Sequence, residues 1–235
     1  MQYEILYPGS NAMISIKLDP GEHVQAEAGA MLSRTEAIDV EGTLAGGFGR
    51  SMKRAVLGGE TLFFQTLRAA RGYGEVNIAP AMLGDIKILP LANGQDYFVK
   101  NGSLLASFEN VTLDTKMQKL STGFFSGAGL FIIHAHGQGH IAVSAFGAVI
   151  EKAVAPGEKF VVDNGHLVAW TGDIDYRIIK GGKTWMSSFT SGEGLACEFT
   201  GPGKIWMQSR NPEAFGGWIR GYVATRGGSV LSLLS

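Results

Sequence analysis

The sequence predicts an all-β protein made of three internal repeats, and two recurring glycine motifs carry this prediction. In the first motif, a turn triplet is followed by a second glycine eight positions after its own glycine. Self-similarity at a fixed spacing is typical of a repeat architecture. The three copies are Pro20-Gly21-Glu22 with Gly29, Asn93-Gly94-Gln95 with Gly102, and Pro156-Gly157-Glu158 with Gly165.

Apolar residues occupy matching offsets after each triplet. The equivalent positions are Val24, Tyr97 and Phe160; Ala26, Val99 and Val162; and Leu32, Leu105 and Val168. The second glycine motif recurs as Gly72-Tyr73-Gly74, Gly137-Gln138-Gly139 and Gly201-Pro202-Gly203. Each copy is followed by apolar residues at alternate positions, which is the period of a strand rather than of a helix. We therefore expect a turn at each motif and a strand after it.

The turn residues predict how strands connect within a repeat. Proline presets φ and glycine accepts a positive φ, so the chain can reverse at the Pro-Gly-Glu triplets. In the third repeat we expect strands at 159–162 and 166–170, joined by a tight turn at Asp163-Asn164-Gly165. Asn-Gly between two apolar runs is typical of a β-hairpin, and Asn101-Gly102 repeats this signal in the second repeat. Each repeat is therefore expected to hold two hairpins, packed as a small β-sandwich or double-stranded β-helix.

Helices are expected to be few. Residues 51–57 could form one short turn with Ser51 as its cap. A second helix is predicted to begin after Asn211, because Asn is a favoured cap and Pro212 suits the first helical position.

The chain is long enough for one or two domains, and the repeats favour a single one. The expected units are about residues 16–80, 88–147 and 152–209, preceded by an N-terminal strand and followed by a short C-terminal tail. A unit of this size buries too little apolar surface to be stable alone. We therefore expect residues 1–235 to form one domain in which three units share a core in a pseudo-threefold arrangement.

Composition narrows the classes of function. The formal net charge is −1, which gives no overall attraction to nucleic acid or anionic lipid. The single cysteine, Cys197, excludes an intramolecular disulfide, and its apolar surroundings predict a buried, unreactive thiol. No signal peptide and no apolar stretch of membrane-spanning length is present. These features predict a cytoplasmic protein without a transmembrane segment.

A further set of motifs carries a family resemblance. The set consists of 41–49, Met52-Lys53-Arg54, Gly58-Gly59-Glu60, Gly74-Glu75-Val76 and Leu83-Gly84-Asp85-Ile86. In this order the motifs resemble an uncharacterised bacterial and archaeal family that includes the mitochondrial protein altered inheritance of mitochondria 24. The resemblance implies three units similar to the tryptophan RNA-binding attenuation protein, and trimeric members. It implies no enzymatic activity and no ligand. For mitochondrial relatives it implies a role in organelle biogenesis and inner-membrane organisation, which does not transfer because this chain lacks a transit peptide.

Open strand edges lead to the same expectation of a trimer. A row of tandem β units leaves an unpaired edge at each end, and unpaired edges invite pairing with another chain. Head-to-tail contacts of this kind usually close into rings. We therefore expect a homotrimer.

One strand carries a candidate metal site. His134 and His136 are two residues apart, so in a strand both side chains point to the same side, and His140 follows four residues later. The spacing resembles the first metal-binding motif of the cupins, although no second motif accompanies it. The first alternative function is therefore a cupin-like metal-dependent enzyme. The simpler interpretation is three histidines that flank a turn at 137–139.

Two loops are candidate contact sites. The first is glycine-rich and basic, which suits an anion, an RNA or a subunit contact, although it lacks the P-loop order. Its residues are Gly46, Gly47, Gly49, Arg50, Lys53 and Arg54. RNA or anion binding between Arg50 and Arg54 is the second alternative function, and the net charge argues against it. The second loop contains Phe124 and Phe125, which could form a partner surface.

No nucleophile motif and no cofactor-binding motif is recognisable in the chain. The sequence therefore favours a non-enzymatic, trimeric scaffold or interaction protein that binds no cofactor and contacts an unidentified protein partner.

Overall fold

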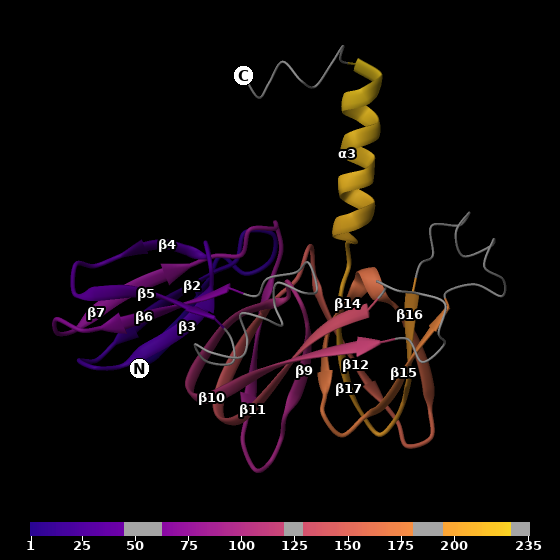
Figure 1. Ribbon diagram of the computed structural model, residues 1–235, viewed down its shortest axis with the longest axis horizontal. Coiled ribbons are helices and arrows are strands. Elements are labelled where there is room, and N and C mark those ends of the chain that lie inside the picture. Colours follow the sequence, from indigo (N-terminus) through magenta and orange to yellow (C-terminus); the bar gives the residue numbers. More distant parts are fainter. Residues whose placement is uncertain (45–62, 120–128, 181–194, 227–235) are drawn as a thin grey trace.

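β-Strands dominate the part of the chain that the computed structural model describes, which is residues 1–44, 63–119, 129–180 and 195–226 (Figure 1). Every pair of named strands in this part is antiparallel, and the strands form three sheets. The all-β class predicted from the sequence is confirmed. The three-repeat, pseudo-threefold arrangement stays a prediction.

The first sheet has four strands, and the third has three. The first, in spatial order, is β1 (Gln2–Leu6), β2 (Met13–Leu18), β7 (Gly74–Ile78) and β4 (Met31–Arg34). The third is β13 (Lys159–Asp163), β16 (Leu195–Thr200) and β15 (Asp175–Lys180). Between them lies a large sheet that takes strands from every part of the chain.

This large sheet has ten strands. Nine of them lie in the order β12 (Val149–Val154), β17 (Gly203–Gln208), β14 (Leu167–Thr171), β9 (Tyr97–Lys100), β11 (Gly129–Ser144), β10 (Leu104–Lys119), β3 (His23–Glu27), β6 (Phe63–Ala69) and β5 (Ile38–Leu44). The tenth, β8 (Ile86–Leu91), pairs with β11. The central strand β11 therefore contacts β8, β9 and β10.

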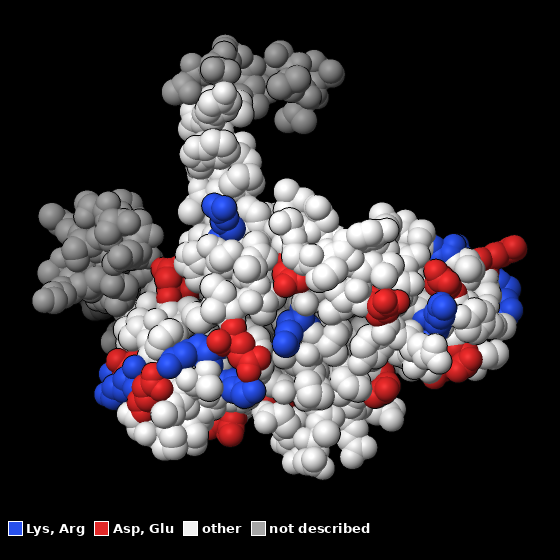
Figure 2. Space-filling model, turned by 180° about the vertical axis from the view of Figure 1, so that it is seen from behind, with Lys and Arg blue, Asp and Glu red and all other residues white. Residues whose placement is uncertain are grey.

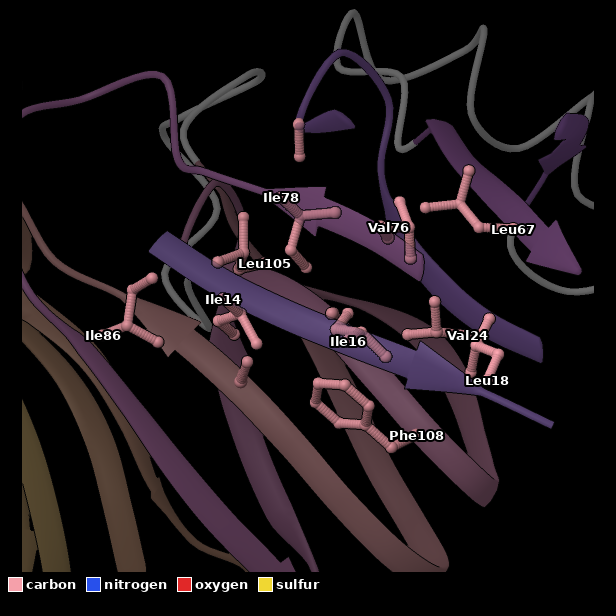
Figure 3. Packing of buried hydrophobic residues seen from close by; sticks show 14 of the residues in the cluster. Ile14, Ile16, Leu18, Val24, Leu67, Val76, Ile78, Ile86, Leu105 and Phe108 are labelled. Atoms are coloured by element: carbon pink, nitrogen blue, oxygen red, sulfur yellow. The ribbon is translucent and has the colours of Figure 1, made fainter. Parts of the chain in front are cut away.

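The buried apolar side chains form three clusters. The first combines the inward faces of β2 and β7 with Leu105 and Phe108 of β10, which pack against Ile14 and Ile16 (Figure 3). Strand β2 alternates buried and less buried residues, as a strand with one face on a core should. The second cluster centres on β9 and β11, and the third on Trp170 and its aromatic neighbours. Each cluster therefore draws on strands that are distant in sequence.

The expected hairpins at the Asn-Gly sites are wrong. Strands form on both sides of each site, but β13 belongs to the three-stranded sheet and β14 to the ten-stranded one. A short 3-10 turn, Asn164–His166, joins them, and its preceding Asp163 accepts a hydrogen bond from the Gly165 N–H at 2.8 Å. Likewise, β9 pairs with β11 and β14 rather than with β10. The turn residues mark corners between sheets, because the two strands that flank each turn pair with other strands and not with each other.

The expected turn at 137–139 is also wrong. These residues lie inside β11, which forms a long hairpin with β10. A Cβ on Gly137 would lie 2.4 Å from the carbonyl oxygen of Asn110, and φ at Gly137 is +113°. Glycine therefore lets the two backbones approach here without ending the strand. At the equivalent glycine motifs the chain does bend between strands, at 72–73 before β7 and at 201–202 before β17.

A short backbone junction links three separated segments. Gly84 forms isolated parallel bridges to both Asn11 and Gly147. Its carbonyl accepts a hydrogen bond from the Ala12 N–H at 3.2 Å, and the Asp85 N–H donates to the Gly147 carbonyl at 2.9 Å. A Cβ on Gly84 would lie 1.7 Å from the carbonyl oxygen of Ala145, so no larger residue fits.

The predicted C-terminal helix is confirmed as α3 (Pro212–Arg226), which projects away from the sheets (Figure 1). The Asn211 Oδ1 atom accepts hydrogen bonds from the N–H groups of Glu213 and Ala214, as expected of a cap. Exposed apolar side chains follow one another along the helix: Phe215, Trp218, Ile219, Tyr222 and Val223. The expected turn at 51–57 lies outside the described residues. None of the helices in the described ranges is long and apolar enough to span a membrane.

Candidate functional site

The two histidines of β11 occupy one face of the central strand. His134 and His136 flank Ala135, which is fully buried on the opposite face. Asp114 of the neighbouring strand β10 stands directly opposite His134 in the strand register. Its Oδ2 atom lies 3.0 Å from the Nε2 atom of His136. The register therefore brings a carboxylate to the histidine pair from one side.

A second carboxylate reaches the pair from the other side. Asp96 precedes β9, whose first residue, Tyr97, stands opposite Ala135. The Oδ2 atom of Asp96 lies 2.5 Å from the Nε2 atom of His134. The backbone carbonyl of Asp96 accepts a hydrogen bond from the Gly172 N–H at 2.9 Å, which fixes the start of the strand. We call these four side chains, Asp96, His134, His136 and Asp114, the histidine–aspartate row.

The row runs from a sheltered end to an exposed end. The His134 ring stacks on Phe98, with 4.8 Å between the ring centroids, and its side chain is only 17% exposed. At the other end, the side chains of His136 and Asp114 are 39% and 54% exposed. The two imidazole centroids are 5.0 Å apart. An ion or a small molecule can thus approach His136 and Asp114 from solvent, while His134 is held by its neighbours.

The structure places His140 away from this row. Its ring lies 5.7 Å from that of Tyr3, and its Nδ1 atom is 3.7 Å from a carboxylate oxygen of Glu109. The third side chain beside His134 and His136 is therefore Asp114. Neither aspartate could be recognised from the sequence, because their positions depend on strand register and no local motif marks them.

The two candidate loops, 46–54 and the segment with Phe124 and Phe125, lie outside the described residues. On the face shown in Figure 2, lysine and arginine side chains are interspersed with aspartate and glutamate. A basic stripe, as expected of a nucleic-acid-binding surface, is not visible on this face.

A cavity of about 430 Å³ lies beside the base of α3. The residues that line it come from segments far apart in the sequence. Among them are Glu27, Met82, Lys100, Phe146, Asn164 and Gln208. The Lys100 Nζ atom donates to the Asn164 carbonyl at 2.7 Å. Burial raises the pKa of the Glu27 carboxyl above its usual range, because the charged form is poorly solvated there.

Replacing Glu27 by glutamine is expected to stabilise the protein at neutral pH. The pKa of Glu27 is higher in the folded than in the unfolded state, so ionised Glu27 opposes folding above the folded-state value. The expected gain is a rise in Tm of up to a few degrees near pH 7. It should shrink as the pH falls and vanish below about pH 4, where Glu27 is protonated in both states. Thermal melts across this range measure it. The exposed Glu36 supplies the control, because Glu36→Gln should leave Tm unchanged; an equal gain in both variants would contradict the explanation.

The buried thiol predicted at Cys197 is confirmed. The residue is 1% exposed, and burial raises the pKa of its thiol to about 11. A thiol with this pKa stays protonated at neutral pH and is a poor nucleophile.

Together these features define an antiparallel β protein with a histidine–aspartate row on its central strand. The chain belongs to the family described as mitochondrial biogenesis AIM24, whose model matches residues 3–210. The resemblance noted from the glycine motifs is thereby confirmed.

Two Streptococcus pyogenes proteins are similar to this chain. The chain is 32% identical over 225 residues to an uncharacterized protein of Streptococcus pyogenes serotype M6, covering 91% of this chain and 87% of that protein. A crystal structure of a Streptococcus pyogenes protein, solved by a structural genomics consortium, superposes with a TM-score of 0.79. It is 28% identical in sequence, and the match covers 94% of this chain and 99% of that one.

Proposed function

We propose that the protein is a non-enzymatic scaffold whose chains assemble head to tail, as a homotrimer, through strands β4 and β13. One observation carries this proposal. Two strand pairs join successive parts of the chain in the same way, and within the described residues each of the two strands that would continue the series, β4 and β13, has one unpaired edge.

The two internal joints have the same register. At the first joint β10 pairs with β3, and Ala106 stands opposite Ala26. At the second, β14 pairs with β9, and Ala169 stands opposite Val99. The sequence repeat equates Ala26 with Val99. Each joint thus pairs the first strand after the turn triplet of one unit, β3 or β9, with the second strand after the triplet of the next unit, β10 or β14.

Strands β4 and β13 are the third copies of these two strand types. β4 contains a register shift between Met31 and Ser33, at the position where β10 and β14 also shift. Within the described residues, β4 pairs only with β7 and β13 only with β16. Continuing the series between chains would place Ser33 of one chain opposite Val162 of the next.

The exposure of the residue at the register shift of β4 supports this pairing. Leu105 and Val168, which sit at the two internal joints, are each 0% exposed, whereas the equivalent Leu32 of β4 is 64% exposed. Val161, on the facing strand β13, is 52% exposed. An unpaired edge with a large exposed apolar side chain is a surface that a second chain would cover.

The projecting helix supports a further contact. Its five exposed apolar residues, Phe215, Trp218, Ile219, Tyr222 and Val223, have the spacing of an apolar helix stripe, which in most proteins faces a core. We assign this stripe to the unidentified protein partner of the scaffold.

The mass in solution tests the assembly. Light scattering should give three times the chain mass of 25.0 kDa at micromolar concentration. Leu32→Lys and Val161→Lys should each weaken association about ten- to hundredfold, because each removes the burial of one apolar side chain, about 1.5–3 kcal/mol.

Leu83→Lys is the matched control, since Leu83 is 68% exposed but lies outside the strands. It should leave the mass unchanged. A monomeric wild-type protein would contradict the proposal, and so would equal dissociation of the Leu32→Lys and Leu83→Lys variants.

A further inference from the structure

We propose that His134, His136 and Asp114 bind a divalent transition-metal ion, and that Asp96 orients His134 for this binding. The site goes beyond the scaffold role and does not depend on it.

The backbone positions of the site are fixed by paired strands. At His134, β11 is paired on both sides, with Asp114 of β10 opposite it on one side and Phe98 of β9 on the other. A metal site on rigid strands has its ligands placed before the ion arrives, which lowers the cost of ordering them on binding.

The three ligand atoms are already close together. One ring nitrogen of each histidine and one carboxylate oxygen of Asp114 all lie within 4.8 Å of one another. Ligand atoms that share one ion at about 2.0–2.2 Å lie somewhat closer than this, so small side-chain rotations suffice. The exposure of His136 and Asp114 leaves a route for the ion and room for water to complete its coordination.

The charges of the row also suit a cation. Among the described residues, Asp96 and Asp114 form ion pairs with His134 and His136 only, and neither carboxylate is paired with a lysine or an arginine. Histidine binds a metal as the neutral imidazole, so with two carboxylates the row would carry a charge of about −2 beside a bound ion. A divalent cation neutralises this charge.

Asp96 has the role of an orienting group. A carboxylate that accepts a hydrogen bond from one nitrogen of an imidazole fixes its tautomer and makes the other nitrogen a better ligand. Asp96 Oδ2 lies 2.5 Å from His134 Nε2, which leaves Nδ1 as the nitrogen that would bind the ion, and stacking on Phe98 holds the ring in place. Two imidazoles and one carboxylate suit zinc, manganese, iron(II) or cobalt(II) better than calcium or magnesium, which prefer oxygen ligands alone.

The test is metal titration of untagged, full-length protein after treatment with a chelator. Calorimetry with Zn²⁺ and Mn²⁺ should show one ion per chain, and Tm should rise as the metal concentration rises. Co²⁺ should give visible absorption bands typical of bound imidazole and carboxylate. His136→Ala and Asp114→Ala should weaken binding at least tenfold. Asp96→Asn should weaken it about 10–100-fold through His134, while the Co²⁺ bands shift rather than disappear.

His140→Ala is the matched control, because this histidine lies on the same strand but outside the row, and His23→Ala is a second control on β3. Both variants should bind as the wild type does. Absence of binding and of a Tm change at millimolar metal would overturn the proposal, leaving the row as two histidine–aspartate ion pairs. Equal losses in His136→Ala and His140→Ala would also overturn it. The chain mass from light scattering is an independent readout, so failure of this site is distinguishable from failure of the scaffold.

Discussion

Trp170→Ala is expected to lower the free energy of unfolding by about 3–5 kcal/mol, the usual cost of truncating a buried aromatic residue to alanine. Trp170 is 0% exposed, and three aromatic rings of the described residues pack around it. Its ring centroid lies 4.9 Å from that of Tyr176, 5.7 Å from that of Phe199 and 5.8 Å from that of Phe98. Alanine would leave a cavity that these large rings cannot fill by small movements. Urea denaturation followed by circular dichroism measures the loss.

Trp170→Phe is the matched variant for this position. It keeps an aromatic ring in the cluster and removes an indole N–H that is buried and has no hydrogen-bond partner in the described part of the chain. Its cost should therefore be clearly smaller than that of alanine, because burial of an unpaired N–H is itself unfavourable. If phenylalanine proved as costly as alanine, ring packing would not be the source of the stability.

Gly84→Val is expected to destabilise the protein by about 3 kcal/mol or more, at the upper end of what overpacking costs. The first atom of any side chain here would lie 1.7 Å from the Ala145 carbonyl oxygen, which is backbone and cannot rotate away. Relief of this clash would separate Gly84 from Asn11 and Gly147, and break the bridges that hold three segments together. Thermal and urea unfolding of the variant should both show the loss.

Gly42→Val provides the comparison for Gly84. Gly42 lies in β5 and is exposed, and among the described residues no atom beyond its two chain neighbours lies within 4 Å of the position of an added Cβ. Valine suits strands, so this change should be neutral or slightly stabilising. Equal destabilisation by the two substitutions would show that loss of backbone freedom, and not the contact with Ala145, decides the effect.

Local features of this fold could be predicted from the sequence. The turn triplets, the alternation after the glycine motifs and the cap at Asn211 all depend on a few neighbouring residues, and all three occur in the structure. Pairing partners could not be predicted. Alternation shows which face of a strand is buried and leaves open which strand lies beside it. For this reason the expected hairpins at the Asn-Gly sites proved to be corners between sheets.

The candidate site has the same limit. The sequence places His134 and His136 on one face, because their spacing is local. Asp96 and Asp114 join them only through the register of β9 and β10 against β11. His140 has suitable spacing in sequence, yet along a strand the separation grows by about 3.3 Å with each residue. Six residues therefore carry His140 too far from His134 to share a ligand with it.

Because of the ten-stranded sheet, we expect the three buried clusters to fold and unfold cooperatively. The sheet takes strands from the beginning, the middle and the end of the chain, and the first core is completed by Leu105 and Phe108 from the middle. Unfolding the strands around one cluster would leave the neighbouring strands of the ten-stranded sheet without a pairing partner and expose their apolar side chains to water. Local unfolding of one part is therefore coupled to the loss of its neighbours. Cooperativity in this protein is a property of the continuous sheet, so damage to any one core lowers the stability of all three.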